Sequence, residues 1–230
     1  MSSFLEGSTF FGVTVSLIGY QLGVLLKRRF KNPVFNPLLI SILFVILMLL
    51  LCRVRYEDYN EGAKYISFLL TPATVCLALP LYQQMELLKS HIAAILAGSV
   101  AGVLTALGSV FILAKIFGLN HQEYVTLLPK SITTAIGMGI SEELGGIVTI
   151  TVAVIIITGI LGNVIGEGVC KLFRIKQPIA KGLALGTAAH AIGTARAMEM
   201  GEVEGAISSL AIAVSGLLTV IGASIFAYFI

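Results

Sequence analysis

Long apolar stretches separated by short polar breaks dominate the pattern of this chain. A helix needs about 20 apolar residues to span the hydrocarbon core of a bilayer, and eight stretches approach that length. We expect helical segments near residues 8–26, 34–52, 64–82, 91–117, 122–140, 146–170, 179–198 and 204–230. The pattern therefore predicts an all-α polytopic membrane protein, with one transmembrane domain over residues 1–230.

Composition and charge agree with this class. Hydrophobic residues make up 57% of the chain and charged residues 12%, whereas a soluble domain carries about 25% charged residues. The net charge of +3 is small and lies in short clusters, which indicates no nucleic-acid partner. The basic clusters at 27–31 and 171–176 are typical of cytoplasmic loops. The three widely spaced cysteines give no metal-binding spacing, and we expect no cofactor.

The chain also resembles itself at an offset of 114 residues. LAGSVAGVLTALG (96–108) and LAIAVSGLLTVIG (210–222) share Leu, Ala, Val, Gly, Leu, Thr and Gly at matching positions. This match predicts two halves, about 1–118 and 119–230. If the third and seventh segments are re-entrant or broken, each half crosses three times and the halves are inverted. Both termini then lie outside, and Lys115 lies inside with both basic clusters.

Two segments contain residues that interrupt helices. The third holds Pro72 and Pro80, with Thr71 placed to cap a new helix. The seventh is interrupted by Gly186 and Gly193, and Thr194 follows as a possible cap. A backbone that breaks at membrane depth is tolerated where it lines a cavity. Broken helices at matching positions of two halves are typical of secondary transporters.

The seventh segment gathers the first candidate site residues, His190, Thr194 and Arg196. In one hypothesis these side chains, with the free N–H groups of a half-helix starting at Thr194, face an anionic substrate. In the other, Arg196 forms a structural ion pair with Glu199, and His190 bonds a backbone carbonyl. The sequence leaves both open.

The fifth segment supplies further candidates. Lys130, Ser131, Thr133 and Thr134 place one cation and three hydroxyls in PKSITT. They either line a site, or Lys130 reaches the membrane surface and the hydroxyls bond their own backbone. Thr71 and Thr74 of the third segment complete the predicted substrate-binding set. We expect Ser141 to Glu143 to begin the next helix.

Small residues predict one helix contact. Gly98, Gly102 and Gly108 in the fourth segment, with Gly205, Ser209 and Gly216 in the eighth, would let these two helices approach closely. The chain contains no GxSxG, HExxH or P-loop motif and no paired aspartates. We therefore expect no enzymatic activity.

Three stretches together resemble the LrgB/CidB family of antiholin-like membrane proteins. They are TPATVCLALPLY (71–82), PKSITTAIGMGIS (129–141) and GLALGTAAHAIGTARAMEM (182–200). The resemblance extends over essentially the whole chain and implies a multi-pass protein of the bacterial cytoplasmic membrane, with a small holin-like LrgA/CidA partner. It also implies a link to the control of murein hydrolase activity and autolysis. Ala135 departs from the family pattern, in which a proline is usual.

Two functions remain open. Related plastid proteins carry glycolate and glycerate, and bacterial relatives are tied to pyruvate, so the resemblance implies a small carboxylate as substrate. The first hypothesis is a homo-oligomeric secondary transporter, which the broken helices favour. The second is a non-transporting, antiholin-like regulatory subunit that binds the LrgA/CidA partner.

Overall fold

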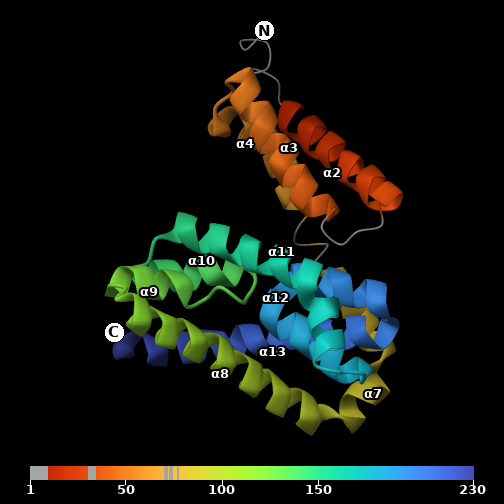
Figure 1. The fold of residues 1–230 in the computed structure, drawn as a ribbon, viewed down its shortest axis with the longest axis vertical. Coiled ribbons are helices and arrows are strands. Elements are labelled where there is room, and N and C mark those ends of the chain that lie inside the picture. Colours follow the sequence, from red (N-terminus) through yellow and green to blue (C-terminus); the bar gives the residue numbers. More distant parts are fainter. Residues whose placement is uncertain (1–9, 31–34, 70–71, 73–74, 77) are drawn as a thin grey trace. The chain divides into compact units, whose positions relative to one another are not determined.

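The structure is a computed structural model that describes residues 10–30, 35–69, 72, 75–76 and 78–230 (Figure 1). The regular elements among these residues are all helices, which confirms the predicted all-α class. The chain divides into two compact units, Met1–Cys76 and Leu77–Ile230. Among the described residues, three helices, all in the second unit, are long and apolar enough to cross a membrane: Ile92–Phe117, Val148–Leu172 and Glu202–Phe229. Eight spans are therefore not confirmed, and the halves 1–118 and 119–230 remain a prediction.

The described part of the first unit contains the helices α2 (Phe11–Phe30), α3 (Pro37–Cys52) and α4 (Tyr56–Phe68). Asn36 caps α3 by accepting hydrogen bonds from the N–H groups of Leu38 and Leu39. Residues 56–63, which lie between two of the predicted segments, form the start of α4. Glu57 and Asp58 stand in its first turn, where acidic side chains stabilise the helix dipole. Arg55 also pairs with Asp58 at 3.0 Å.

The third predicted segment, 64–82, is not one helix in the described residues. Helix α4 ends at Phe68, and α6 covers Ala78–Gln83. The predicted site residues Thr71 and Thr74 lie outside the described residues. Helix α7 (Met85–Ser90) then leads into α8.

Helices α8 (Ile92–Phe117), α11 (Val148–Leu172) and α13 (Glu202–Phe226) frame the second unit. Helices α8 and α13 run parallel, because Ile95 shares a buried cluster with Ile207, and Leu107 lies against Gly222 further along both helices. Inverted halves would make this pair antiparallel, so the structure does not support the predicted inversion for these two helices. The reason is the fifth segment. It does not cross this unit as a single helix, so the chain makes one crossing fewer between α8 and α13 than the inverted arrangement requires.

That fifth segment folds as a hairpin of two short helices, α9 (His121–Leu127) and α10 (Thr134–Glu143). Its limbs meet in a polar contact in which the Thr151 hydroxyl of α11 lies 2.9 Å from the Thr126 carbonyl oxygen and 2.7 Å from Ser141 Oγ. The single helix predicted at 122–140 is therefore wrong. Ser141 to Glu143 end α10 rather than begin α11, because the chain turns at Gly145, whose φ is +79°.

The seventh segment, α12 (Pro178–Met200), is also a hairpin. Ala189 and His190 leave helical geometry, and His190 has φ 42° and ψ −138°. The first limb runs parallel to α13, since Gly182 lies against Glu204 and Gly186 against Ser208. The second limb returns to where the first began, because its Arg196 pairs with Glu167 near the end of α11.

The break in α12 thus falls between the two positions at which it was predicted. Gly186 and Gly193 lie within the limbs and allow close contacts there. A Cβ at Gly193 would lie 2.5 Å from the carbonyl oxygen of Leu185, which shows how closely the limbs approach. Thr194 does not cap the second limb. Its hydroxyl donates to the carbonyl oxygen of His190 at 3.0 Å.

The predicted contact between α8 and α13 is present, since Ile95 and Ile207 share a buried cluster, but it does not use the glycines predicted to form it. Gly98 and Gly102 of α8 face Leu183 and Thr187 of α12, not α13, and nothing lies within 4 Å of a Cβ at Gly108. Gly205 and Gly216 face Met198 and Ile136. Lys115 stands in the last turn of α8, at the opposite end of the unit from the 171–176 cluster, because α11 runs antiparallel to α8.

Candidate functional site

Two hairpins meet beside the middle of α11. The α9–α10 hairpin follows the end of α8, whereas α12 starts near the end of α11, so the hairpins enter the unit from opposite ends. Ile155 of α11 contacts both of them. Its side chain faces Gly137 of α10, and its carbonyl oxygen accepts a hydrogen bond of 3.0 Å from Nε2 of His190. The bends of both hairpins therefore lie near one level of the unit.

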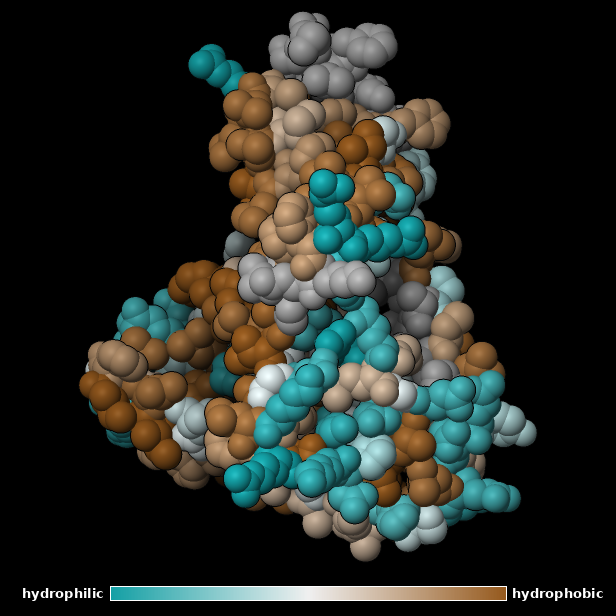
Figure 2. Space-filling view, turned by 45° about the vertical axis from the view of Figure 1, so that its right-hand side comes forward, coloured by the Kyte–Doolittle hydropathy of each residue, from teal (hydrophilic) through white to brown (hydrophobic). Residues whose placement is uncertain are grey.

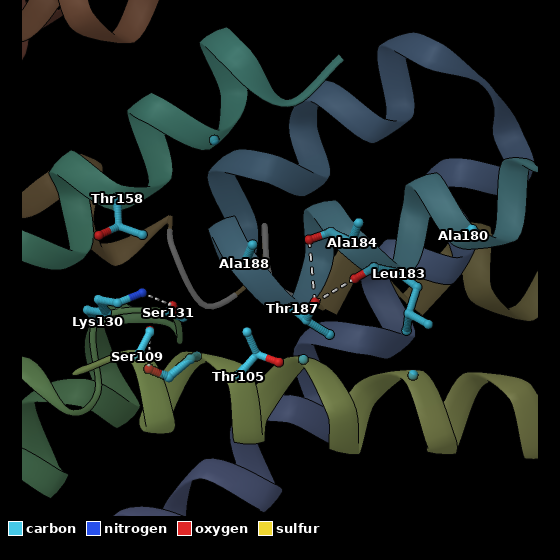
Figure 3. Close-up of a pocket in the computed structure, with 14 residues that line it drawn as sticks. Thr105, Ser109, Lys130, Ser131, Thr158, Ala180, Leu183, Ala184, Thr187 and Ala188 are labelled. Carbon is cyan, nitrogen blue, oxygen red and sulfur yellow. Dashed lines mark hydrogen bonds between the residues drawn. The ribbon is translucent and has the colours of Figure 1, made fainter. Parts of the chain in front are cut away.

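A cavity of about 600 Å³ lies next to these bends. Helix α8, helix α11, the first limb of α12 and the bend of the α9–α10 hairpin line it, and it opens to the surface beside the exposed Ala180 and Ala184 (Figure 3). It extends from Lys130 and Ser131 at that bend to Ala180 near the start of α12. Its polar lining residues are Thr105, Ser109, Lys130, Ser131, Thr158 and Thr187.

The lining combines one cation with five hydroxyls. Lys130 Nζ donates a hydrogen bond of 3.0 Å to Ser131 Oγ. No carboxylate lines the cavity among the described residues, and Lys130 has no acidic partner within that part of the chain. Lys130 is partly buried, and a partly desolvated cation without a counter-ion favours an anionic ligand, because transfer of an unpaired charge out of water is costly.

The cavity hydroxyls are not equivalent. Those of Thr105, Ser109 and Thr187 donate to carbonyl oxygens one turn earlier in their own helices, at 2.7–2.8 Å. Ser131 accepts the lysine hydrogen bond, which leaves its own O–H available as a donor. Lys130 and Ser131 are thus the donors best placed to hold an anion.

The structure brings together only part of the predicted site. Lys130 and Ser131 line the cavity. Thr133 and Thr134, at the start of α10, are partly buried and do not line it. His190 lies behind the cavity, is only 3% exposed and bonds the Ile155 carbonyl. This bond to a backbone carbonyl is the one expected if His190 has a structural role rather than a substrate-binding one.

Thr194 and Arg196 also lie away from the cavity. Thr194 is fully buried and shares a hydrogen bond of 2.7 Å with Ser208 of α13. Arg196 pairs with Glu199 at 2.5 Å and also with Glu167. It lines a second cavity, of about 530 Å³, at the ends of α11 and α12. Arg196 and Lys130 therefore do not share one site.

Four polar residues of the cavity lining were not among the predicted site residues: Thr105, Ser109, Thr158 and Thr187. A signal for them exists in α8, where Gly98, Gly102, Thr105 and Ser109 recur at the three- and four-residue spacing of one helix face. That face was assigned to contact with another helix, although its small residues also leave space for a cavity.

Comparison with known proteins gives the family. The LrgB-like family profile matches residues 16–229. The antiholin-like proteins LrgB of Bacillus cereus (strain B4264) and Bacillus anthracis (strain A0248) are each 44% identical to this chain over 222 residues. The match covers 96% of this chain and 96% of each relative. No solved structure matches. The chain therefore belongs to the LrgB-like family, as do these antiholin-like relatives.

Proposed function

We propose that this protein is a secondary transporter of small carboxylates in the bacterial cytoplasmic membrane and that the Lys130 cavity is its substrate site. The observation that carries the proposal is the position of Lys130. Its ammonium stands at the bend of a hairpin, in a cavity that has hydroxyls but no carboxylate among its described lining residues. A charge-assisted hydrogen bond there contributes about 1.5–3 kcal/mol to holding an anion.

The two hairpins support a transport role. Secondary transporters place substrates where broken helices meet near the membrane midplane. Here the cavity extends from the hairpin bends towards the start of α12, beside the 171–176 basic cluster. If that cluster is cytoplasmic, the cavity faces the cytoplasm. Movement of a hairpin bend past the substrate would then provide access from the other side.

Chemistry limits the substrate class. A cavity of about 600 Å³ with one cation suits a small monoanion, and the resemblance points to glycolate, glycerate or pyruvate. His190, Thr194 and Arg196 stabilise the hairpin in this proposal and do not touch the substrate. A homo-oligomeric assembly remains part of the proposal.

A second candidate is supported by the name of the relatives, antiholin-like protein LrgB. In this alternative the chain is a non-transporting regulatory subunit. It binds a holin-like LrgA/CidA partner and so tunes murein hydrolase activity and autolysis. The two candidates differ in whether the chain alone moves a solute.

Proteoliposomes that contain only this chain test the difference. We expect uptake of radiolabelled pyruvate or glycolate by the wild type. Lys130→Gln should reduce uptake by roughly tenfold to a hundredfold, in line with the loss of one charge-assisted contact. Lys130→Arg should retain part of the uptake, and the exposed Lys89→Gln should retain all of it. Wild-type uptake by correctly folded Lys130→Gln would refute the substrate site, and absence of any uptake by the wild type would favour the regulatory subunit.

A further inference from the structure

The second cavity of this unit has a strongly cationic lining. It lies at the turn between α11 and α12 and holds five cationic side chains and two acidic ones. The cations are Lys171, Arg174, Lys176, Lys181 and Arg196, and the acids are Glu167 and Glu199. Hydrophilic residues gather over a broad part of the surface that includes this end of the unit (Figure 2).

Pairing concentrates the uncompensated charge on two residues. Glu167 pairs with both Arg196 and Lys171, and Glu199 pairs with Arg196. Lys181 lies 4.0 Å from Glu204. Arg174 and Lys176 have no acidic partner in the described part of the chain, and both are exposed. The turn therefore presents two free cations beside a set of neutralised ones.

The backbone of the turn adds to the attraction for an anion. Arg174 ends α11 with φ 56°, and the N–H of Ile175 donates to the carbonyl oxygen of Cys170 at 2.8 Å. The chain then enters α12 at Pro178 without a side-chain cap. An uncapped helix N-terminus carries partial positive charge. Arg174, Lys176 and this helix start thus place positive charge on the same short turn.

Apolar side chains flank the two cations. Leu172 and Phe173 are 76% and 71% exposed, and Val169 and Ile165 continue the apolar face along α11. An anion held at Arg174 and Lys176 would therefore have hydrocarbon-compatible surface directly beside it. That combination suits an acidic phospholipid, whose phosphate needs the cations and whose acyl chains need the apolar helix face.

We propose that the α11–α12 turn binds the phosphate group of an acidic membrane phospholipid through Arg174 and Lys176, with acyl chains along Ile165, Val169 and Phe173. The site is separate from the Lys130 cavity and does not depend on transport. Lys171 and Arg196 stay paired with carboxylates on the cavity side of α11, which is the side away from Ile165 and Val169. An acidic lipid bound there joins the end of α11 to the start of α12.

Thermal unfolding of the purified full chain in neutral detergent tests the site. Phosphatidylglycerol should raise the unfolding temperature in a saturable way, whereas phosphatidylcholine should not. The double variant Arg174→Gln/Lys176→Gln should need about thirtyfold more phosphatidylglycerol for the same shift, because each cation near an acidic lipid contributes about 1 kcal/mol of binding free energy. The control Lys89→Gln/Lys115→Gln removes the same charge outside the cavity and should behave as the wild type.

Three outcomes would overturn the proposal. One is a wild-type protein that phosphatidylglycerol does not stabilise more than phosphatidylcholine does. Another is an equal loss in the control variant, which would show a general charge effect. The third is the same stabilisation by inorganic phosphate at equal concentration, which would assign the cations to a free anion. Native mass spectrometry of lipid carried through purification provides a second readout that does not depend on unfolding.

Discussion

Gly186 of α12 lies so close to Ser208 of α13 that a Cβ on the glycine would be 2.6 Å from the serine carbonyl oxygen. Backbone rather than a flexible side chain forms this contact, so the two helices would have to separate to admit a larger residue. We expect Gly186→Leu to destabilise the protein by about 1–3 kcal/mol through overpacking.

Thermal unfolding in detergent measures this effect. Gly108→Leu is the matched control, since no atom lies within 4 Å of a Cβ there. An unchanged unfolding temperature for Gly186→Leu would contradict the close packing of α12 on α13.

The bend of the α12 hairpin should depend on the His190 imidazole. The ring bonds the Ile155 carbonyl and lies where a Cβ at Gly159 would be 2.8 Å from two of its atoms. His190→Ala removes the bond and leaves a buried void, so we expect a loss of about 1–3 kcal/mol in the free energy of unfolding. Hydrogen exchange should accelerate at residues 187–193. The exposed His91→Ala is the control, and equal protection in both variants would exclude an anchoring role.

The base of the same hairpin should depend on a charge network. Arg196 bonds Glu167 of α11 as well as Glu199 of its own helix. Its side chain is 22% exposed and that of Glu167 is 32% exposed, so solvent screens the pair and we expect a coupling energy of only about 1 kcal/mol.

A double-mutant cycle with Arg196→Gln and Glu167→Gln isolates this coupling. Thermal stability of the four proteins is the measurement. Purely additive effects would show that the pair contributes nothing to holding the second limb on α11.

The Lys130 cavity should be blocked by a bulky side chain on the first limb of α12. Ala184 is exposed and lines the cavity, so Ala184→Phe should abolish carboxylate uptake while leaving the unfolding temperature unchanged. Ala101→Phe places the same ring on α8, at an exposed position outside the cavity lining. Normal uptake by a normally folded Ala184→Phe variant would show that the substrate does not pass through the Lys130 cavity.

Apolar length and the polar breaks were enough to predict the long apolar helices of the second unit, although they also predicted spans that the described residues do not form as single helices. Predicted segments 91–117 and 146–170 correspond closely to α8 (Ile92–Phe117) and α11 (Val148–Leu172). The glycines in the seventh segment correctly suggested a break, but its position could not be predicted. His190 adopts a positive φ that non-glycine residues rarely take, and contacts with α11 and α13 hold it there.

The fifth segment was misjudged for a related reason. Its apolar content resembles that of a spanning helix. Pro129 is the one residue of the bend, Leu128 to Thr133, that is typical of a helix break. The hairpin depends on contacts between distant residues, such as Thr126 with Ile147 and Thr151. Helical periodicity carries no information about such pairs. The same limit explains why Arg196, three residues after the buried Gly193, was grouped with Lys130.

The folded-back form of residues 178–200 affects how the chain enters the bilayer during synthesis. A segment that starts and finishes at one end of the unit cannot be released into lipid as an ordinary spanning helix, because the backbone at its bend would lack partners there. Its partners include Ile155 and also Ser208, which follows it in the chain. We therefore expect this segment to stay beside the insertion machinery until the ribosome has completed α13, so that biogenesis of the second unit finishes in one late, concerted step.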